Sequence, residues 1–120
     1  MFDGKIENGK LVIGEDEVLL APGLPDQKVN VGIRPEGFIL AENGRMKNEM
    51  IHPEVTGRDV SILSRNKASQ SDVIRSIISA EDWAHIPGEH VRFDLKPYKV
   101  FLFEPETGKR IDVELKRIEG

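Results

Sequence analysis

The parts of this 120-residue chain that come closest to a nucleotide-binding motif are three Gly-Lys pairs: Gly4-Lys5, Gly9-Lys10 and Gly108-Lys109. A phosphate-binding loop has the pattern Gly-x-x-x-x-Gly-Lys-Ser/Thr, because its backbone N–H groups and lysine surround the phosphates while its hydroxyl holds magnesium. Around Gly108-Lys109, Phe103 occupies the first glycine position and Arg110 the hydroxyl position. We therefore expect no catalytic residues, no ATP hydrolysis, and no ATP, magnesium or other cofactor bound by this chain.

Side chains that bind metals or transfer protons are scattered along the sequence. The histidines His52, His85 and His90 form no His-Glu-x-x-His motif, and there is no cysteine. Zinc sites need clustered ligands, so we expect solvated loop histidines and no metal. The runs Glu15-Asp16-Glu17 and Glu81-Asp82 are interpreted as solvated turns, since carboxylates do acid–base work only in a cleft that shifts their pKa values. The Gly-x-Ser-x-Gly elbow of many hydrolases is also missing.

Composition limits the partners that the chain can bind. Its 17 basic and 21 acidic side chains give a net charge of -4, which disfavours broad contact with a phosphate backbone. Small barrels nevertheless bind single strands through stacked aromatics, and Trp83 and Tyr98, with Lys96 and Lys99 beside them, are the candidate stackers here. The remaining strand aromatics are expected in the core: Phe38, Phe93, and Phe101 or Phe103.

Length and apolar content favour one cytosolic domain. A chain of 120 residues fits a single domain, 1–120. The segment Met1–Lys5 has neither the apolar core nor the cleavage site of a signal peptide. The longest apolar runs, such as Val18–Ala21, have four residues, far too few to span a bilayer. The absence of cysteine suits a reducing compartment.

The elements that must position these side chains are mainly strands. Apolar residues alternate with polar ones in the segments 28–33, 91–96 and 111–116, which is the period of a strand with one buried face. Asn8-Gly9 predicts a tight hairpin between 5–7 and 10–13, Asn43-Gly44 gives the same signal, and Thr107-Gly108 marks another turn. The segment 73–79 fits a short helix or a strand buried on both faces, and we favour the strand. The pattern predicts an all-β barrel or sandwich.

An internal repeat refines this prediction. Residues 24–40 (LPDQKVNVGIRPEGFIL) align without gaps with 86–102 (IPGEHVRFDLKPYKVFL), so that Pro25 matches Pro87 and Pro35 matches Pro97. A proline after a basic residue removes a ladder N–H and favours a corner between two strands. We interpret the two segments as related half-barrel units, with chance convergence of strand-turn-strand patterns as the alternative.

The segment Gly32-Ile33-Arg34-Pro35-Glu36 resembles the Gly-Ile/Val-Arg-Pro-Glu motif of a known family. That family comprises the C-terminal regulatory domains (TOBE domains, relatives of molybdate-binding MOP barrels) of ATP-binding subunits in maltose-type and related sugar ABC importers. The segment 4–9 is similar to their entry hairpin, and 87–97 with 100–111 to their closing strands. Their phosphate loop and Leu-Ser-Gly-Gly-Gln signature are missing here, so we expect an excised fragment or a split gene without the ATPase core.

The resemblance implies an OB-like or MOP-like barrel that acts as an accessory, regulatory and dimerisation domain. Its partners would be its own ATPase core, a second ATP-binding subunit and a regulatory protein, on the cytoplasmic side of a sugar importer. For the motif residues we favour a structural role, with Arg34 and Glu36 paired across a corner. Trp83 is the candidate interface residue. The alternatives are a barrel that senses an oxyanion or a sugar, and a single-strand-binding OB module.

Overall fold

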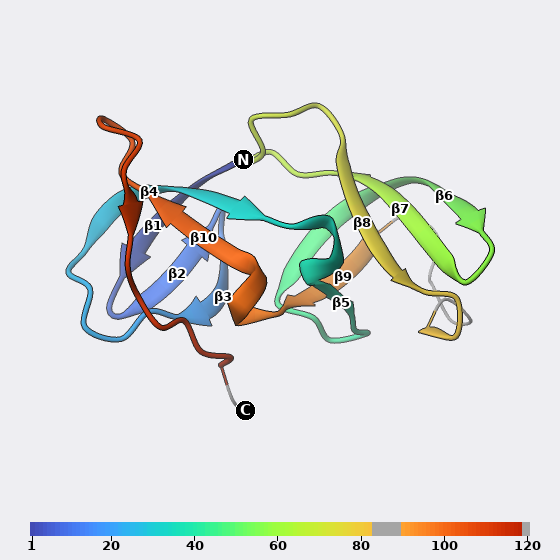
Figure 1. Ribbon diagram of the computed structural model, residues 1–120, viewed down its shortest axis with the longest axis horizontal. Coiled ribbons are helices and arrows are strands. Elements are labelled where there is room, and N and C mark those ends of the chain that lie inside the picture. The colour runs from blue at the N-terminus through green and yellow to red at the C-terminus, as the bar shows by residue number, and fades with distance from the viewer. Residues whose placement is uncertain (83–89, 119–120) are drawn as a thin grey trace.

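The computed structural model describes residues 1–82 and 90–118, and within these residues the chain forms strands and short 3₁₀ turns with no α-helix (Figure 1). The all-β fold class predicted from the sequence is confirmed. The strands are β1 (Phe2–Glu7), β2 (Lys10–Ile13), β3 (Asp16–Leu20), β4 (Gln27–Ile33), β5 (Phe38–Leu40), β6 (Met46–Thr56), β7 (Asp59–Arg65), β8 (Ile74–Ser79), β9 (His90–Leu95), β10 (Val100–Phe103) and β11 (Arg110–Ile111). The 3₁₀ turns η1 (Pro35–Gly37) and η3 (Pro97–Lys99) separate β4 from β5 and β9 from β10.

Two sheets curl into two barrels that lie side by side along the long axis of the molecule (Figure 1). The six-stranded barrel has the order β11-β10-β4-β1-β2-β3, and the five-stranded barrel has the order β5-β9-β6-β7-β8. The segment after β11 joins the two edges of the first barrel, because Leu20 and Lys116 exchange backbone hydrogen bonds of 2.7 and 3.0 Å. In the second barrel β8 packs against β5 and η1, so its ends nearly meet.

Alternating strand residues fill both barrels. Val29 and Val31 of β4, Val91, Phe93 and Leu95 of β9, and Val100 and Leu102 of β10 are all buried. In the five-stranded barrel the rings of Phe38 and Phe93 meet edge to face at 5.1 Å between centroids, a favoured geometry for aromatic pairs. The segment 73–79 is a strand from Ile74, as favoured by its β-branched residues, but the expectation that both faces are buried is wrong. Ile74, Ser76 and Ile78 are buried, whereas Arg75 and Ser79 are exposed.

The hairpin predicted at Asn8-Gly9 is confirmed, whereas the second one is wrong. Asn8 and Gly9 have φ values of 53° and 73° and connect β1 to β2, with Glu7 opposite Lys10. Asn43-Gly44 connects β5 to β6, but β5 pairs with β9 rather than with β6. A Cβ added at Gly44 would lie 2.6 Å from backbone atoms of Phe93. This glycine therefore permits a close approach to β9 and forms no hairpin turn.

The predicted strand at 111–116 is largely wrong. Only Arg110–Ile111 pairs as β11, opposite Phe103 and Leu102. The alternation nevertheless continues, with Ile111 and Val113 half-buried, Asp112 and Glu114 exposed, and Leu115 buried. After Ile111 the segment leaves β10 and crosses to β3, where Lys116 pairs with Leu20. It therefore forms no continuous strand ladder with either neighbour. The turn at Thr107-Gly108 is confirmed, with Gly108 at a φ of 73°.

The repeat corresponds to two equivalent strand–corner–strand units, β4-η1-β5 and β9-η3-β10. Pro35 and Pro97 each begin the 3₁₀ turn of their unit. The units run antiparallel to each other through both barrels, since Ile33 pairs with Val100 and Phe38 with Leu95. Residues 86–89, which would match 24–27, lie outside the described part. The prediction of related half-barrel units is thus confirmed.

Among the described residues, none forms a helix with the length and hydropathy that a membrane span requires.

Candidate functional site

The two repeat units meet at their corners, where the motif residues lie. The N–H of Arg34 donates to the carbonyl oxygen of Lys99 at 3.1 Å, and the N–H of Lys96 donates to that of Gly37 at 2.8 Å. Lys96 is the repeat equivalent of Arg34, and Lys99 is the equivalent of Gly37. The two bonds are therefore related by a local two-fold axis. They hold η1 against η3 at the crossing from one barrel to the other.

Gly37 is packed closely against η3 at this corner. It is buried, and a Cβ at this position would lie 2.7 Å from the Cβ of Lys99. The backbones of η1 and η3 can approach only because this position lacks a side chain. Pro35 and Pro97 stand at the first turn position, where no N–H is needed.

Glu36 forms its ion pair with Lys99 across the corner, and not with Arg34 as the sequence interpretation assumed. The Glu36 Oε1 and Lys99 Nζ atoms are 3.5 Å apart on half-exposed side chains. A hydrogen bond from its own backbone N–H is the main reason that the pKa of Glu36 lies below its ordinary value near 4.5. The charges of Lys99 and, more weakly, Arg34 lower it further, while desolvation opposes the shift. A purely structural role for the motif residues stays a prediction.

Arg34 instead lies over an aromatic ring on the outside of the six-stranded barrel. Its guanidinium carbon is 5.4 Å from the ring centroid of Phe101, and that of Arg110 is 4.8 Å from the same centroid. Phe101 and Phe103 are half-buried on the outer face of β10, because Val100 and Leu102 take the inward positions. The expectation that Phe101 or Phe103 is a core residue is therefore wrong.

The candidate nucleic-acid residues are only partly described. Tyr98 in η3 is 70% exposed, and the Nζ of Lys99 lies 5.7 Å from its ring centroid. Lys96 is half-buried beside them. Trp83, the candidate interface residue and the second candidate stacker, lies outside the described residues. The structure therefore presents a single exposed aromatic at this corner among the residues that it describes.

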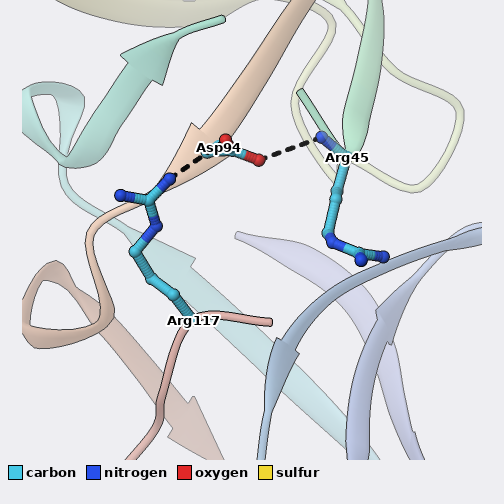
Figure 2. A network of polar contacts seen from close by, with 3 residues as sticks. All are labelled: Arg45, Asp94 and Arg117. Carbon is cyan, nitrogen blue, oxygen red and sulfur yellow. Dashed lines mark hydrogen bonds and ion pairs between the residues drawn. The ribbon is translucent and has the colours of Figure 1, made fainter. Parts of the chain in front are cut away.

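Asp94 connects the C-terminal segment to the five-stranded barrel (Figure 2). Its Oδ1 accepts the backbone N–H of Arg45 at 3.1 Å, and its Oδ2 pairs with a guanidinium nitrogen of Arg117 at 3.1 Å. Arg117 follows Lys116, which closes the six-stranded barrel. The carboxylate of Asp94 thus links the β5–β6 loop, β9 and the closing segment.

Polar side chains also enter the five-stranded barrel from β6, β7 and β8. The buried Asn48 donates from Nδ2 to the Ser64 hydroxyl at 3.1 Å and accepts a bond of 2.8 Å from Asn66. The hydroxyl of Ser76 is fully buried and has no hydrogen-bond partner within the described chain. No sequence pattern indicated this polar group, because single serines in strands are common.

A shallow groove between the barrels carries charges of both signs. Its lysine and arginine side chains are Lys47, Arg65 and Lys67, its acidic ones are Glu15, Asp16, Glu49 and Asp72, and His90 also lines it. With four carboxylates against three lysine or arginine cations, the groove creates little attraction for an oxyanion. In residues 1–82 and 90–118, no three metal-binding side chains gather in one place. The acidic run 15–17 is partly engaged, since Asp16 accepts the N–H of Lys47 and Glu17 pairs with Lys10.

Two histidines can be placed. His52 lies exposed in β6, with its Nε2 3.7 Å from a Glu54 carboxylate oxygen, and His90 is exposed at the start of β9. The prediction that they lie in loops is wrong, although both side chains face outward. His85 lies outside the described residues.

Two curated proteins are similar to this chain. The sn-glycerol-3-phosphate import ATP-binding protein UgpC of Ruegeria sp. (strain TM1040) is 25% identical over 107 residues, which cover 89% of this chain and 30% of that protein. UgpC 2 of Agrobacterium fabrum (strain C58) is 27% identical over 117 residues, covering 92% of this chain and 30% of that protein. No protein-family model matches the chain.

The chain therefore spans about 30% of the length of the curated relatives that it matches, in their C-terminal region. The resemblance to ATP-binding subunits of this importer class, predicted from the motif segments, is confirmed.

Proposed function

We propose that this chain is the accessory and regulatory domain of an ABC importer's ATP-binding subunit and that it acts by pairing with a second copy. The observation that carries the proposal is the match to import ATP-binding proteins over about nine-tenths of this chain and less than a third of theirs. A domain in this position belongs to a complex at the cytoplasmic face of a membrane. Its direct partners would be the ATPase core and the second ATP-binding subunit.

The fold supports a role in holding subunits rather than in catalysis. The polar networks at the corner and at Asp94 fix the two barrels to each other, which suits a spacer that transmits movement without deforming. None of the three Gly-Lys pairs in the sequence completes a phosphate loop. ATP hydrolysis would therefore reside in the core that such subunits carry, and this domain would stabilise or adjust the subunit pair.

For the imported compound, we propose only a general class. The motif resemblance points to sugar uptake, and the names of the two relatives specify sn-glycerol-3-phosphate import. Neither compound would contact this domain, because importers select their substrate through other subunits. We propose that the domain serves an importer of this general class and can dock a regulatory protein.

Sedimentation velocity of the full chain over a wide concentration range tests the pairing. A two-fold contact needs a patch that fits its own copy, and an isolated domain retains only part of the contacts of a whole subunit. We therefore expect a reversible monomer–dimer equilibrium with a dissociation constant on the order of 0.1–1 mM, weak on the scale of protein association. A strictly monomeric chain at millimolar concentration would contradict the pairing.

A further inference from the structure

An aromatic and basic face on the outside of the six-stranded barrel has no function in the preceding account. This Phe101 face consists of Phe101 and Phe103 on β10, Arg110 on β11, and Arg34, which lies between β4 and η1. Phe101 stands opposite Gly32 and Phe103 opposite Arg110 in the strand ladders. The Phe103 ring and the Met1 sulfur border the space beside Gly32, because a Cβ at that position would lie 3.5 Å from Cε2 of Phe103 and 3.8 Å from Sδ of Met1. Both rings are half-buried and both guanidinium groups are exposed.

The two arginines of this face are free of carboxylate partners within the described residues, where the ion pairs of the region are Glu36–Lys99 and Arg117–Asp94. A guanidinium that lies over a ring uses its planar face, so its N–H donors point from its edge toward other groups. Carboxylates fit such a fork with two parallel hydrogen bonds. Arg34 and Arg110 thus lie beside the same ring, both are exposed, and both can pair with carboxylates of a partner.

The surroundings favour an acidic protein over a nucleic acid. Glu36 lies beside Arg34, the exposed Glu104 and Glu106 follow β10, and the whole chain carries a charge of -4. A phosphate polymer would extend over these carboxylates and be repelled, whereas a folded or extended protein segment can place its carboxylates at two points only. Half-buried phenylalanine beside arginine is also the composition that carries binding energy in protein interfaces.

We propose that the Phe101 face docks an acidic protein segment, with carboxylates on Arg34 and Arg110 and an apolar side chain on Phe101 and Phe103. The attraction comes from the two arginines of this face alone, because the chain as a whole is acidic and would repel an acidic partner elsewhere. The docking does not depend on the transporter proposal, since it follows from the surface alone.

The test uses the full chain and a fluorescent peptide that carries two Glu residues separated by Leu residues. The same peptide with Gln in place of Glu and a single-stranded thymidine oligonucleotide are compared by fluorescence anisotropy. Amide shifts in ¹⁵N-labelled protein locate the contact, and we expect them in β10, β11 and at Arg34. The Glu peptide should bind, and the Gln peptide should bind at least about tenfold more weakly, because each charge-assisted bond contributes about as much as a tenfold change in affinity.

Matched variants separate this face from the general charge of the protein. The double variant Arg34→Gln/Arg110→Gln should weaken binding of the Glu peptide about tenfold or more. The double variant Arg34→Lys/Arg110→Lys should also weaken this binding, because lysine keeps the charge but lacks the forked donors of arginine. Arg58→Gln/Arg75→Gln removes two exposed arginines elsewhere and should stay within about twofold of the wild type, since distant exposed charges are screened. Equal loss in the two glutamine variants would overturn the proposal, as would shifts outside the Phe101 face. If the oligonucleotide binds more tightly than the Glu peptide, the face binds nucleic acid instead. If no saturable binding of the Glu peptide is seen at millimolar concentration, the proposal is wrong.

Discussion

Replacing Gly44 by alanine should destabilise the fold strongly, whereas the same change at Gly32 should not. Neither glycine needs a positive φ, so the difference between the variants reports on space alone. At Gly44 a Cβ would lie 2.6 Å from the backbone N and carbonyl C of Phe93 and 2.7 Å from its O, about 0.8 Å short of ordinary contact. Phe93 is paired on both sides, with Leu40 and Met46, so its backbone has little freedom to shift.

The expected magnitude for Gly44→Ala is at the upper end of overpacking costs, about 3 kcal/mol of unfolding free energy. For a domain of this size that loss lowers Tm by about 12 °C. At Gly32 the nearest atom to an added Cβ is Cε2 of Phe103 at 3.5 Å, an ordinary contact. Gly32→Ala should therefore be neutral or stabilising by up to about 1 kcal/mol, since alanine restricts the unfolded chain.

Urea unfolding and thermal melts of both variants measure this difference. The reasoning is refuted if the two variants lose equal stability, or if Gly44→Ala melts within about 2 °C of the wild type, since overpacking of a paired strand should cost more than that. The result also bears on the motif, because Gly32 is part of it. A neutral Gly32→Ala would show that the first motif residue is not required for folding.

Four further outcomes follow from the described contacts and from the sequence. Ser76→Ala should raise the free energy of unfolding by about 1 kcal/mol, because it removes a buried hydroxyl without a partner. Ser64→Ala should lower the free energy of unfolding by about 1–2 kcal/mol, because Asn48 loses its hydrogen-bond acceptor. Urea unfolding measures both changes. Because the folded pKa of Glu36 is lowered, its stabilising effect should be present near neutral pH and disappear as the pH falls below about 4.5. The difference in Tm between wild type and Glu36→Gln should accordingly vanish in acid, and a difference that persists at low pH would contradict a stabilising role of the ionised Glu36 carboxylate. Calorimetry should detect no micromolar binding of Mg-ATP, which the missing phosphate loop predicts.

The sequence predicted local features well where one residue type determines the backbone. Asn8-Gly9 can adopt two positive φ values, and Pro35 and Pro97 can begin turns that other residues would continue as strand. The repeat, read from these prolines, led to the correct strand–corner–strand units. Alternation of apolar residues likewise separated Val29 and Val31 from their outward neighbours.

Long-range pairings could not be predicted in the same way. Asn43-Gly44 has the composition of a hairpin, but its glycine permits contact with Phe93, which lies far along the chain. Lys99 competes with Arg34 for Glu36 only once the two corners meet. The apolar character of Phe101 suggested burial, and only the inward positions of its neighbours place it outside. These features depend on which strands pair, and composition does not specify that.

The most direct test of the central proposal replaces the matching C-terminal segment of the Ruegeria import ATP-binding protein with this chain and measures ATP-dependent uptake of sn-glycerol-3-phosphate. The controls are the relative truncated before that segment and the relative fused to an unrelated barrel of similar size. If this chain is an accessory domain of such subunits, the chimera should assemble with a second copy and import at a rate well above both controls. Uptake no higher than in the two controls, from a chimera that is folded and present at equal level, would contradict the proposal.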